Sequence, residues 1–252
     1  MEKHSFQTPF GEIWLWSRPG ALSADQPVVL FINGAFSIER PRSFELPDLL
    51  PEAAVLNTHL PGQHTPALVA DSVGVYGSAL SAALDQIGRP AIVAGASVGG
   101  LVALAMRSPL IRGLVLIETP LRTGKLWPLV DFFRAELRKR PADAQLRDFL
   151  WTIFGVCETA HADRDYSPLL AALDKPAWAL FGGEPLYPVR ETEAVPSLVD
   201  EPERRLFAGQ AGVRTWVIPG VGHNLPGRAI AAVCDCARDL LQRSGLVQAG
   251  VA

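Results

Sequence analysis

The sequence contains a series of short, almost wholly apolar runs that recur along most of its length. They occupy residues 28–32, 54–56, 91–94, 113–117, 177–181 and 214–218. Continuous apolar runs of this length are typical of strands buried on both faces, as in parallel sheets. Between them lie segments with apolar residues at helical spacing, such as 69–87 and 229–241. Because strand and helix alternate, the sequence predicts an α/β fold with a mainly parallel central sheet flanked by helices.

One long interval interrupts this alternation. Two short strands are predicted within residues 6–17, which makes the run at 113–117 the sixth strand. After it, residues 119–175 contain no strand pattern but three apolar stripes at helical spacing. We therefore predict a small helical cap at 119–175, inserted after the sixth strand, with 1–118 and 176–252 forming the core.

Composition excludes several classes of function. The 252 residues carry a net charge of −3, which argues against nucleic-acid binding as the main role. No apolar run approaches the roughly 20 residues that cross a bilayer, so no membrane association is expected. The N-terminus lacks the apolar stretch of a signal peptide, and three cysteines are too few for a disulfide framework. These features predict a cytoplasmic protein, either a monomer or a homodimer.

A candidate nucleophile lies in the segment Gly95-Ala96-Ser97-Val98-Gly99, which matches G-x-S-x-G. An apolar run precedes the motif and a helical pattern follows it, so the predicted context is strand, sharp turn, helix. A serine at such a turn is held in a strained backbone conformation near a helix N-terminus, which favours developing negative charge. The alternative is a glycine-rich turn in which Ser97 only caps the helix.

With this motif in its context, the chain resembles the α/β-hydrolase superfamily over residues 6–241, and within it the capped esterase, thioesterase and lactonase group. Members carry a nucleophile, an acid and a histidine in that order along the chain. The resemblance implies that His223, in Gly-Val-Gly-His after the last apolar run, is the catalytic base. The alternative is a loop histidine that caps the last helix.

The acid has two candidates. Glu184, in Glu-Pro-Leu-Tyr-Pro after the run at 177–181, aligns with the Asp-Pro-Leu-x-Pro that the family often has. The resemblance therefore implies that Glu184 orients the imidazole of His223 and stabilises its charged form. Glu184 could instead be a surface carboxylate. The rival is Glu118, which directly follows the run at 113–117, where some family members place the acid.

The resemblance also implies an oxyanion hole and a substrate pocket. Its two donors are the backbone N–H groups of Val98 and Ala35. Ala35 follows Asn33-Gly34, where the family usually has His-Gly. Phe36 is expected to line the floor of the pocket. Two residues of the cap, Trp127 and Trp151, lie beside the apolar stripes and are expected to face the ligand.

The implied function is a serine hydrolase that cleaves a small-molecule ester, thioester or lactone through an acyl-enzyme intermediate. No cofactor and no metal are expected, because the sequence lacks phosphate-binding, dinucleotide-binding and metal-ligand motifs. One alternative is a carbon–carbon bond hydrolase or lyase in the same pocket, since fold does not separate these activities. Another alternative is a non-catalytic ligand receptor.

Overall fold

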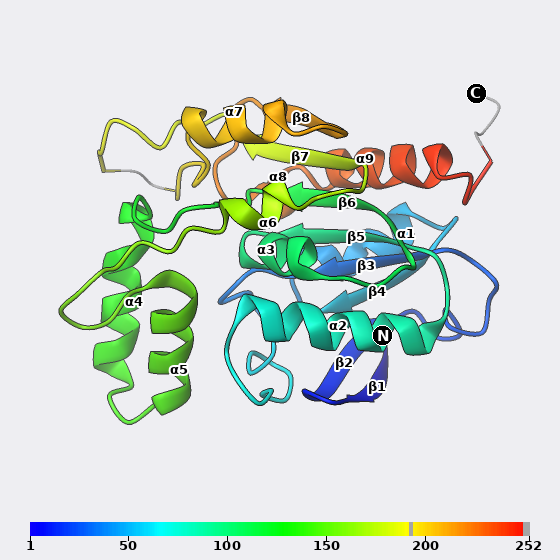
Figure 1. Ribbon diagram of the computed structural model, residues 1–252, viewed down its shortest axis with the longest axis horizontal. Coiled ribbons are helices and arrows are strands. Elements are labelled where there is room, and N and C mark those ends of the chain that lie inside the picture. Colours follow the sequence, from blue (N-terminus) through cyan, green and yellow to red (C-terminus); the bar gives the residue numbers. More distant parts are fainter. Residues whose placement is uncertain (192–193, 249–252) are drawn as a thin grey trace.

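The centre of the molecule is an eight-stranded sheet with the strand order β1-β2-β4-β3-β5-β6-β7-β8 (Figure 1). The computed structural model describes residues 1–191 and 194–248. β1 and β2 are antiparallel, and from β4 to β8 every neighbouring pair is parallel. The bounds are β1 Glu2–Thr8, β2 Gly11–Ser17, β3 Val28–Ile32, β4 Ala54–Thr58, β5 Ala91–Ala96, β6 Ile111–Ile117, β7 Ala177–Gly182 and β8 Val213–Ile218. The predicted mainly parallel α/β architecture is confirmed.

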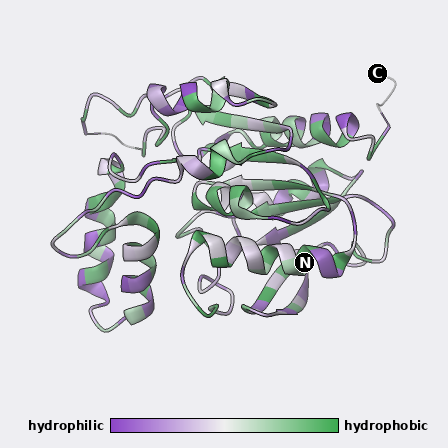
Figure 2. Cartoon of the chain, in the orientation of Figure 1, coloured by the Kyte–Doolittle hydropathy of each residue, from purple (hydrophilic) through white to green (hydrophobic). Residues whose placement is uncertain are grey.

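Burial on both faces explains the continuous apolar runs. All residues of β3, β4 and β5 are buried. Side chains alternate between the faces of a strand, so Leu30 and Ile32 of β3 pack in one core cluster while Val29 and Phe31 pack in the other. Figure 2 shows these central strands in the colour of hydrophobic residues.

The helices cover both faces of the sheet. The bounds outside the β6–β7 connection are η1 Arg42–Glu45, α1 Leu46–Leu49, α2 Val73–Ile87, α3 Val98–Ala105, α7 Glu201–Gly209, α8 Leu225–Arg228 and α9 Ile230–Arg243. Buried side chains of α2 and α3 belong to one core cluster, and those of α1 and α9 belong to the other. Each parallel strand is therefore followed by a helix that returns the chain, and the loops at the carboxyl edge are left to carry the site.

The chain between β6 and β7, which we call the helical insertion, contains no β-strand. Its helical elements are α4 Trp127–Lys139, α5 Ala144–Phe149, a π-helical turn η2 Leu150–Phe154 and α6 Ser167–Ala171. α4 and α5 project beyond the ends toward which the strand arrows point (Figure 1). The buried aromatic residues Phe133 of α4, Phe149 of α5 and Phe154 of η2 are continuous with one core cluster. The insertion thus stands over the carboxyl edge of the sheet. Among the described helices, none is long and apolar enough to span a membrane.

Candidate active site

Ser97 lies at a sharp turn between β5 and α3. Its φ of +55° belongs to a region that non-glycine residues rarely adopt. The turn requires glycine on both sides. A Cβ atom on Gly95 would lie 2.2 Å from the carbonyl oxygen of Gly99, and one on Gly99 would lie 2.3 Å from that of Ile32. The predicted strand–turn–helix context is present, and it places Ser97 at the N-terminus of α3.

His223 lies in the loop between β8 and α8. Its backbone N–H donates to the carbonyl oxygen of Val195 at 3.0 Å, which fixes the loop. Its imidazole Nδ1 lies 3.3 Å from Oε2 of Glu118. The contact leaves Nε2 as the ring nitrogen turned away from Glu118, so the carboxylate sets the orientation of the ring.

Glu118 follows β6 and is almost completely buried, with 1% of its surface exposed. Its Oε1 accepts hydrogen bonds from the N–H of Gly182 at 2.6 Å and from the hydroxyl of Ser197 at 2.7 Å. Its Oε2 accepts one from the N–H of Leu198 at 2.9 Å and also faces His223. Burial of an unpaired carboxylate is costly, and these donors compensate for the lost water.

Glu184 lies elsewhere, which corrects the expectation that it contacts His223. Its side chain is exposed and forms no hydrogen bond with any described residue. Only its backbone is engaged: its N–H donates to Val221 O at 3.1 Å, and its carbonyl accepts from Ser197 N at 2.9 Å. At the end of β7 it is the backbone that contacts the site, because the N–H of Gly182 donates to Oε1 of Glu118. The side chain of Glu184, two residues further on, is exposed instead.

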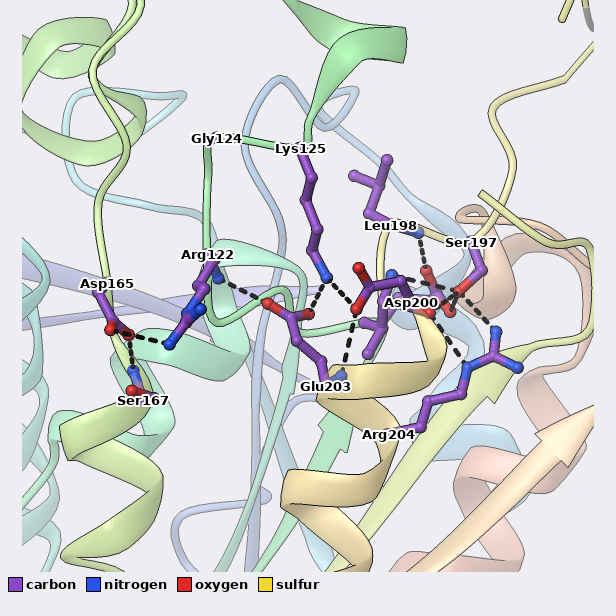
Figure 3. Close-up of polar contacts among 12 residues, drawn as sticks. Arg122, Gly124, Lys125, Asp165, Ser167, Ser197, Leu198, Asp200, Glu203 and Arg204 are labelled. Atoms are coloured by element: carbon purple, nitrogen blue, oxygen red, sulfur yellow. Dashed lines mark hydrogen bonds and ion pairs between the residues drawn. The ribbon is translucent and has the colours of Figure 1, made fainter. Parts of the chain in front are cut away.

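Arg204 of α7 supports the loop that holds Glu118. Its guanidinium donates to the hydroxyl of Ser197 at 3.1 Å, to Gly182 O at 2.6 Å and to Val199 O at 3.1 Å. Figure 3 shows this guanidinium turned toward Ser197. No local sequence pattern marks Ser197 or Arg204, because their contacts with β7 and Glu118 join segments far apart in the chain.

A buried ion pair ties the start of the insertion to α7. Nζ of Lys125 lies 2.7 Å from Oδ1 of Asp200 and 2.5 Å from Oε2 of Glu203 (Figure 3). The other carboxylate oxygen of Glu203 accepts the N–H of Arg122 at 2.8 Å. Burial raises the pKa of Glu203 to about 6, against the lowering effect of Lys125.

The loop after β3 runs directly against the nucleophile. A Cβ atom on Gly34 would lie 3.2 Å from Cβ of Ser97. The side chain of Asn33 fixes this loop. Its Nδ2 donates to Thr58 O at 2.8 Å, and its Oδ1 accepts from the hydroxyl of Ser43 at 2.8 Å. Neither the N–H of Ala35, next in this loop, nor that of Val98 donates to another residue in the described part of the chain.

A cavity of about 330 Å³ opens between this loop and the insertion. Ser97 and His223 both line it, as do Ala35 and Phe36. The remaining lining residues are Pro128, Leu129, Phe132, Phe133, Phe154 and Val195. The cavity is therefore apolar apart from the serine and the histidine.

The two tryptophans expected to face a ligand do not line this cavity. Trp151 is 43% exposed, and the guanidinium of Arg164 lies over its ring at 4.8 Å. Trp127 begins α4, and the residues that line the cavity follow it at Pro128, Leu129 and Phe132. Leu129 and Phe133, which belong to the apolar stripe of α4, do line the cavity, so the stripe itself marks the face that meets it and the tryptophans beside the stripes do not.

No cluster suited to a metal ion is found in residues 1–191 and 194–248, where no three His, Cys, Asp or Glu side chains come together. The polar groups at the site are instead the hydroxyl of Ser97 and the imidazole of His223, which line the cavity, and the backbone N–H groups of Ala35 and Val98. This is the set of groups that acyl transfer through a serine requires.

The family model described as "Alpha/beta hydrolase family" matches residues 29–235. No relative was found among curated proteins.

Solved structures with the same fold include three that cover both chains almost completely. A thermophilic esterase from Thermogutta terrifontis is 18% identical, with a TM-score of 0.63 over 97% of this chain and 99% of the other. A proline iminopeptidase from Mycobacterium smegmatis is 15% identical, with a TM-score of 0.66 over 96% and 99%. An esterase from Pyrococcus furiosus is 16% identical, with a TM-score of 0.64 over 96% and 91%. At these identities, the likeness concerns the fold.

Proposed function

The chain belongs to the alpha/beta hydrolase family, and from this premise we propose that it is a serine hydrolase of small-molecule carboxylic esters, thioesters or lactones. One observation carries the proposal. Ser97, in its strained turn, and His223, held by Glu118, line the same cavity. The N–H of Val98, next to Ser97 in the sequence, and that of Ala35, which lines the same cavity, have no hydrogen-bond partner among the described residues.

The proposed reaction begins when Oγ of Ser97 attacks the substrate carbonyl carbon and Nε2 of His223 takes the hydroxyl proton. Glu118 accepts the hydrogen on Nδ1 and stabilises the imidazolium that forms. The N–H groups of Val98 and Ala35 donate to the oxyanion of the tetrahedral intermediate. His223 then gives its proton to the leaving alcohol or thiol, which leaves an acyl group on Ser97.

Water completes the proposed cycle. His223 removes a proton from water, the hydroxide attacks the acyl carbon, and the acid product leaves as Ser97 regains its proton. Protonation of the leaving group and activation of water require the same nitrogen, Nε2. A single imidazole, fixed by a buried carboxylate, therefore serves both halves of the reaction.

The walls of the cavity favour a compact apolar substituent next to the scissile carbonyl. Phe36, Phe133 and Phe154 contribute aromatic surface, and the ring centroids of Phe36 and Phe133 lie 5.6 Å apart. Pockets of this kind bind through apolar contact and are oriented by a few polar groups. We therefore propose short aliphatic or aryl acyl groups as preferred substrates.

Labelling with a fluorophosphonate probe tests the proposal directly. Wild-type protein should be labelled at Ser97 and should hydrolyse p-nitrophenyl esters, whereas Ser97→Ala should do neither. A panel of short-chain and long-chain esters, thioesters and lactones then ranks the substrate classes. A protein that is neither labelled nor active on this panel would contradict the proposal and favour the receptor alternative.

A further inference from the structure

We propose that Gln63 is a positioning residue that fixes the second oxyanion donor, an inference that rests on the proposed function. Gln63 lies in the loop after β4, and its Oε1 accepts a hydrogen bond from the backbone N–H of Phe36 at 2.7 Å. Phe36 directly follows Ala35, whose N–H is the proposed donor. The side chain of one loop thus holds the backbone of the other.

The backbone of Phe36 needs such support. Its φ is +57°, in the left-handed region that residues with a side chain rarely adopt. A strained residue keeps this conformation only where its surroundings enforce it. Two constraints act on Phe36: its ring packs against Phe132 and Phe133, and its N–H is bound by Gln63.

The hydrogen bond also decides which N–H is left for the substrate. Ala35 and Phe36 offer consecutive N–H groups beside Ser97. Because Gln63 binds that of Phe36, that of Ala35 is the one of the two with no partner in the described part of the chain, and it is left to meet an oxyanion. The same bond fixes the peptide plane between the two residues, and therefore the direction of the loop as it passes the nucleophile.

Gln63 is itself held firmly. Its own N–H donates to Leu60 O at 2.9 Å, which closes a turn. The two loops meet at two further points. The hydroxyl of Ser37 bonds with Nδ1 of His59 at 2.9 Å, and Nε2 of His64 bonds with Ser37 O at 3.0 Å. Burial lowers the pKa of His59, which suits a neutral ring that accepts from Ser37. The support is therefore a rigid element.

Gln145 provides a matched control for Gln63. Both glutamines line a second cavity of about 480 Å³, which shares Phe36 and Phe132 with the catalytic cavity. The side chain of Gln145 lies against Gly62 and forms no hydrogen bond with the described loop after β3. Replacing either glutamine changes the lining of the second cavity. Replacing Gln63 also removes the hydrogen bond to the N–H of Phe36, whereas replacing Gln145 does not.

The experiment compares Gln63→Met, Gln63→Glu and Gln145→Met on one p-nitrophenyl ester, with rates expressed per fluorophosphonate-labelled site. Methionine keeps the size of the side chain but cannot accept the N–H, so kcat should fall about 10- to 100-fold with KM nearly unchanged. Affinity for a trifluoromethyl ketone, which places an oxyanion at the same donors, should fall in parallel. Gln63→Glu keeps an acceptor for the N–H of Phe36 and should retain more of kcat than Gln63→Met, whereas Gln145→Met should stay close to wild type.

Two results would overturn the inference. One is a Gln63→Met enzyme with the kcat and the ketone affinity of Gln145→Met. The other is a loss of kcat in Gln63→Met with no change in ketone affinity. Gln63→Asn, one methylene too short to reach Phe36, repeats the test should Gln63→Met unfold. Failure of the proposed function itself is distinct, because wild-type protein would then be neither labelled nor active.

Discussion

Glu118 and His223 are 105 residues apart in the chain, and their side chains meet at 3.3 Å over the carboxyl edge of the sheet. Glu118 stands where the chain leaves β6 for the insertion, and His223 stands in the loop after β8. The acid of the proposed triad thus follows β6, which is the neighbour in the sheet of β5, the strand that leads to Ser97.

Replacing Glu118 tests its role against that of Glu184. Glu118→Gln should lower kcat by about 10²–10⁴, because the amide cannot stabilise the imidazolium and can hold the ring in the wrong tautomer. Its NH₂ group would also meet the N–H donors of Gly182 or Leu198, so the melting temperature should fall. Glu184→Gln, at an exposed position, should change neither quantity appreciably. Steady-state kinetics and thermal melts of the two variants measure these effects. A Glu184→Gln variant that is folded but has lost its activity would assign the acid to Glu184 instead.

Ser97→Ala isolates the nucleophile. We expect kcat to fall by about 10⁴–10⁶. The φ of +55° at this position is no easier for alanine than for serine, so stability should change little. Circular dichroism and urea unfolding serve as the check on folding. Retention of most activity by a folded variant would exclude serine catalysis here.

Glu203 predicts a pH dependence of stability. Its pKa is raised from 4.5 to about 6 in the folded protein, so between these values the folded state binds more protons than the unfolded state. Its contribution to the free energy of unfolding is therefore most favourable below about pH 4.5 and decreases as pH rises through 6. A shift of this size corresponds to about 2 kcal/mol.

Urea unfolding of wild type and Glu203→Gln at pH 4.5, 6 and 7.5 measures this contribution. The difference in unfolding free energy between the two proteins should change across this window. As pH rises, the unfolding free energy of wild type should fall relative to that of Glu203→Gln. Equal pH profiles for the two proteins would mean that Glu203 titrates normally despite its burial.

Two neighbouring phenylalanines of α4 should separate specificity from stability. Phe132 lines the catalytic cavity and is 44% exposed, whereas Phe133 lines it from a buried position with 1% exposed. Phe132→Ala should therefore shift the preferred acyl length toward longer chains with a small change in melting temperature. Phe133→Ala should lower the unfolding free energy by about 3–5 kcal/mol. Ester profiles and melts of both, with Trp151→Ala as the control that should leave the profile unchanged, provide the measurement.

The strands of the sheet could be predicted from the sequence because burial on both faces favours apolar residues at every position of a strand. The run at 28–32 matches β3 at both ends, and the helical stripe through 69–87 matches the end of α2 at Ile87. α7, by contrast, was not predicted. Its sequence, EPERRLFAG, offers one fully buried side chain, Phe207, so it carries almost no apolar periodicity.

Sequence patterns single out Ser97 and His223, but they do not show which carboxylate contacts His223. Ser97 and His223 follow local signals, a strand–turn–helix motif and a glycine-rich turn. The choice between Glu118 and Glu184 depends instead on which carboxylate meets buried donors. Those donors come from Gly182, Ser197 and Leu198, which are distant from Glu118 in the chain. No local pattern around Glu118 encodes them.

The exposed turn after β7 has a practical consequence for engineering. Glu118 lies beside His223, and neither Tyr187 nor Val189 lines the cavity that contains Ser97 and His223; both side chains are substantially exposed. An affinity tag, a fluorophore or a tether to a solid support placed at Tyr187 would therefore lie outside that cavity and leave the proposed catalytic groups uncovered.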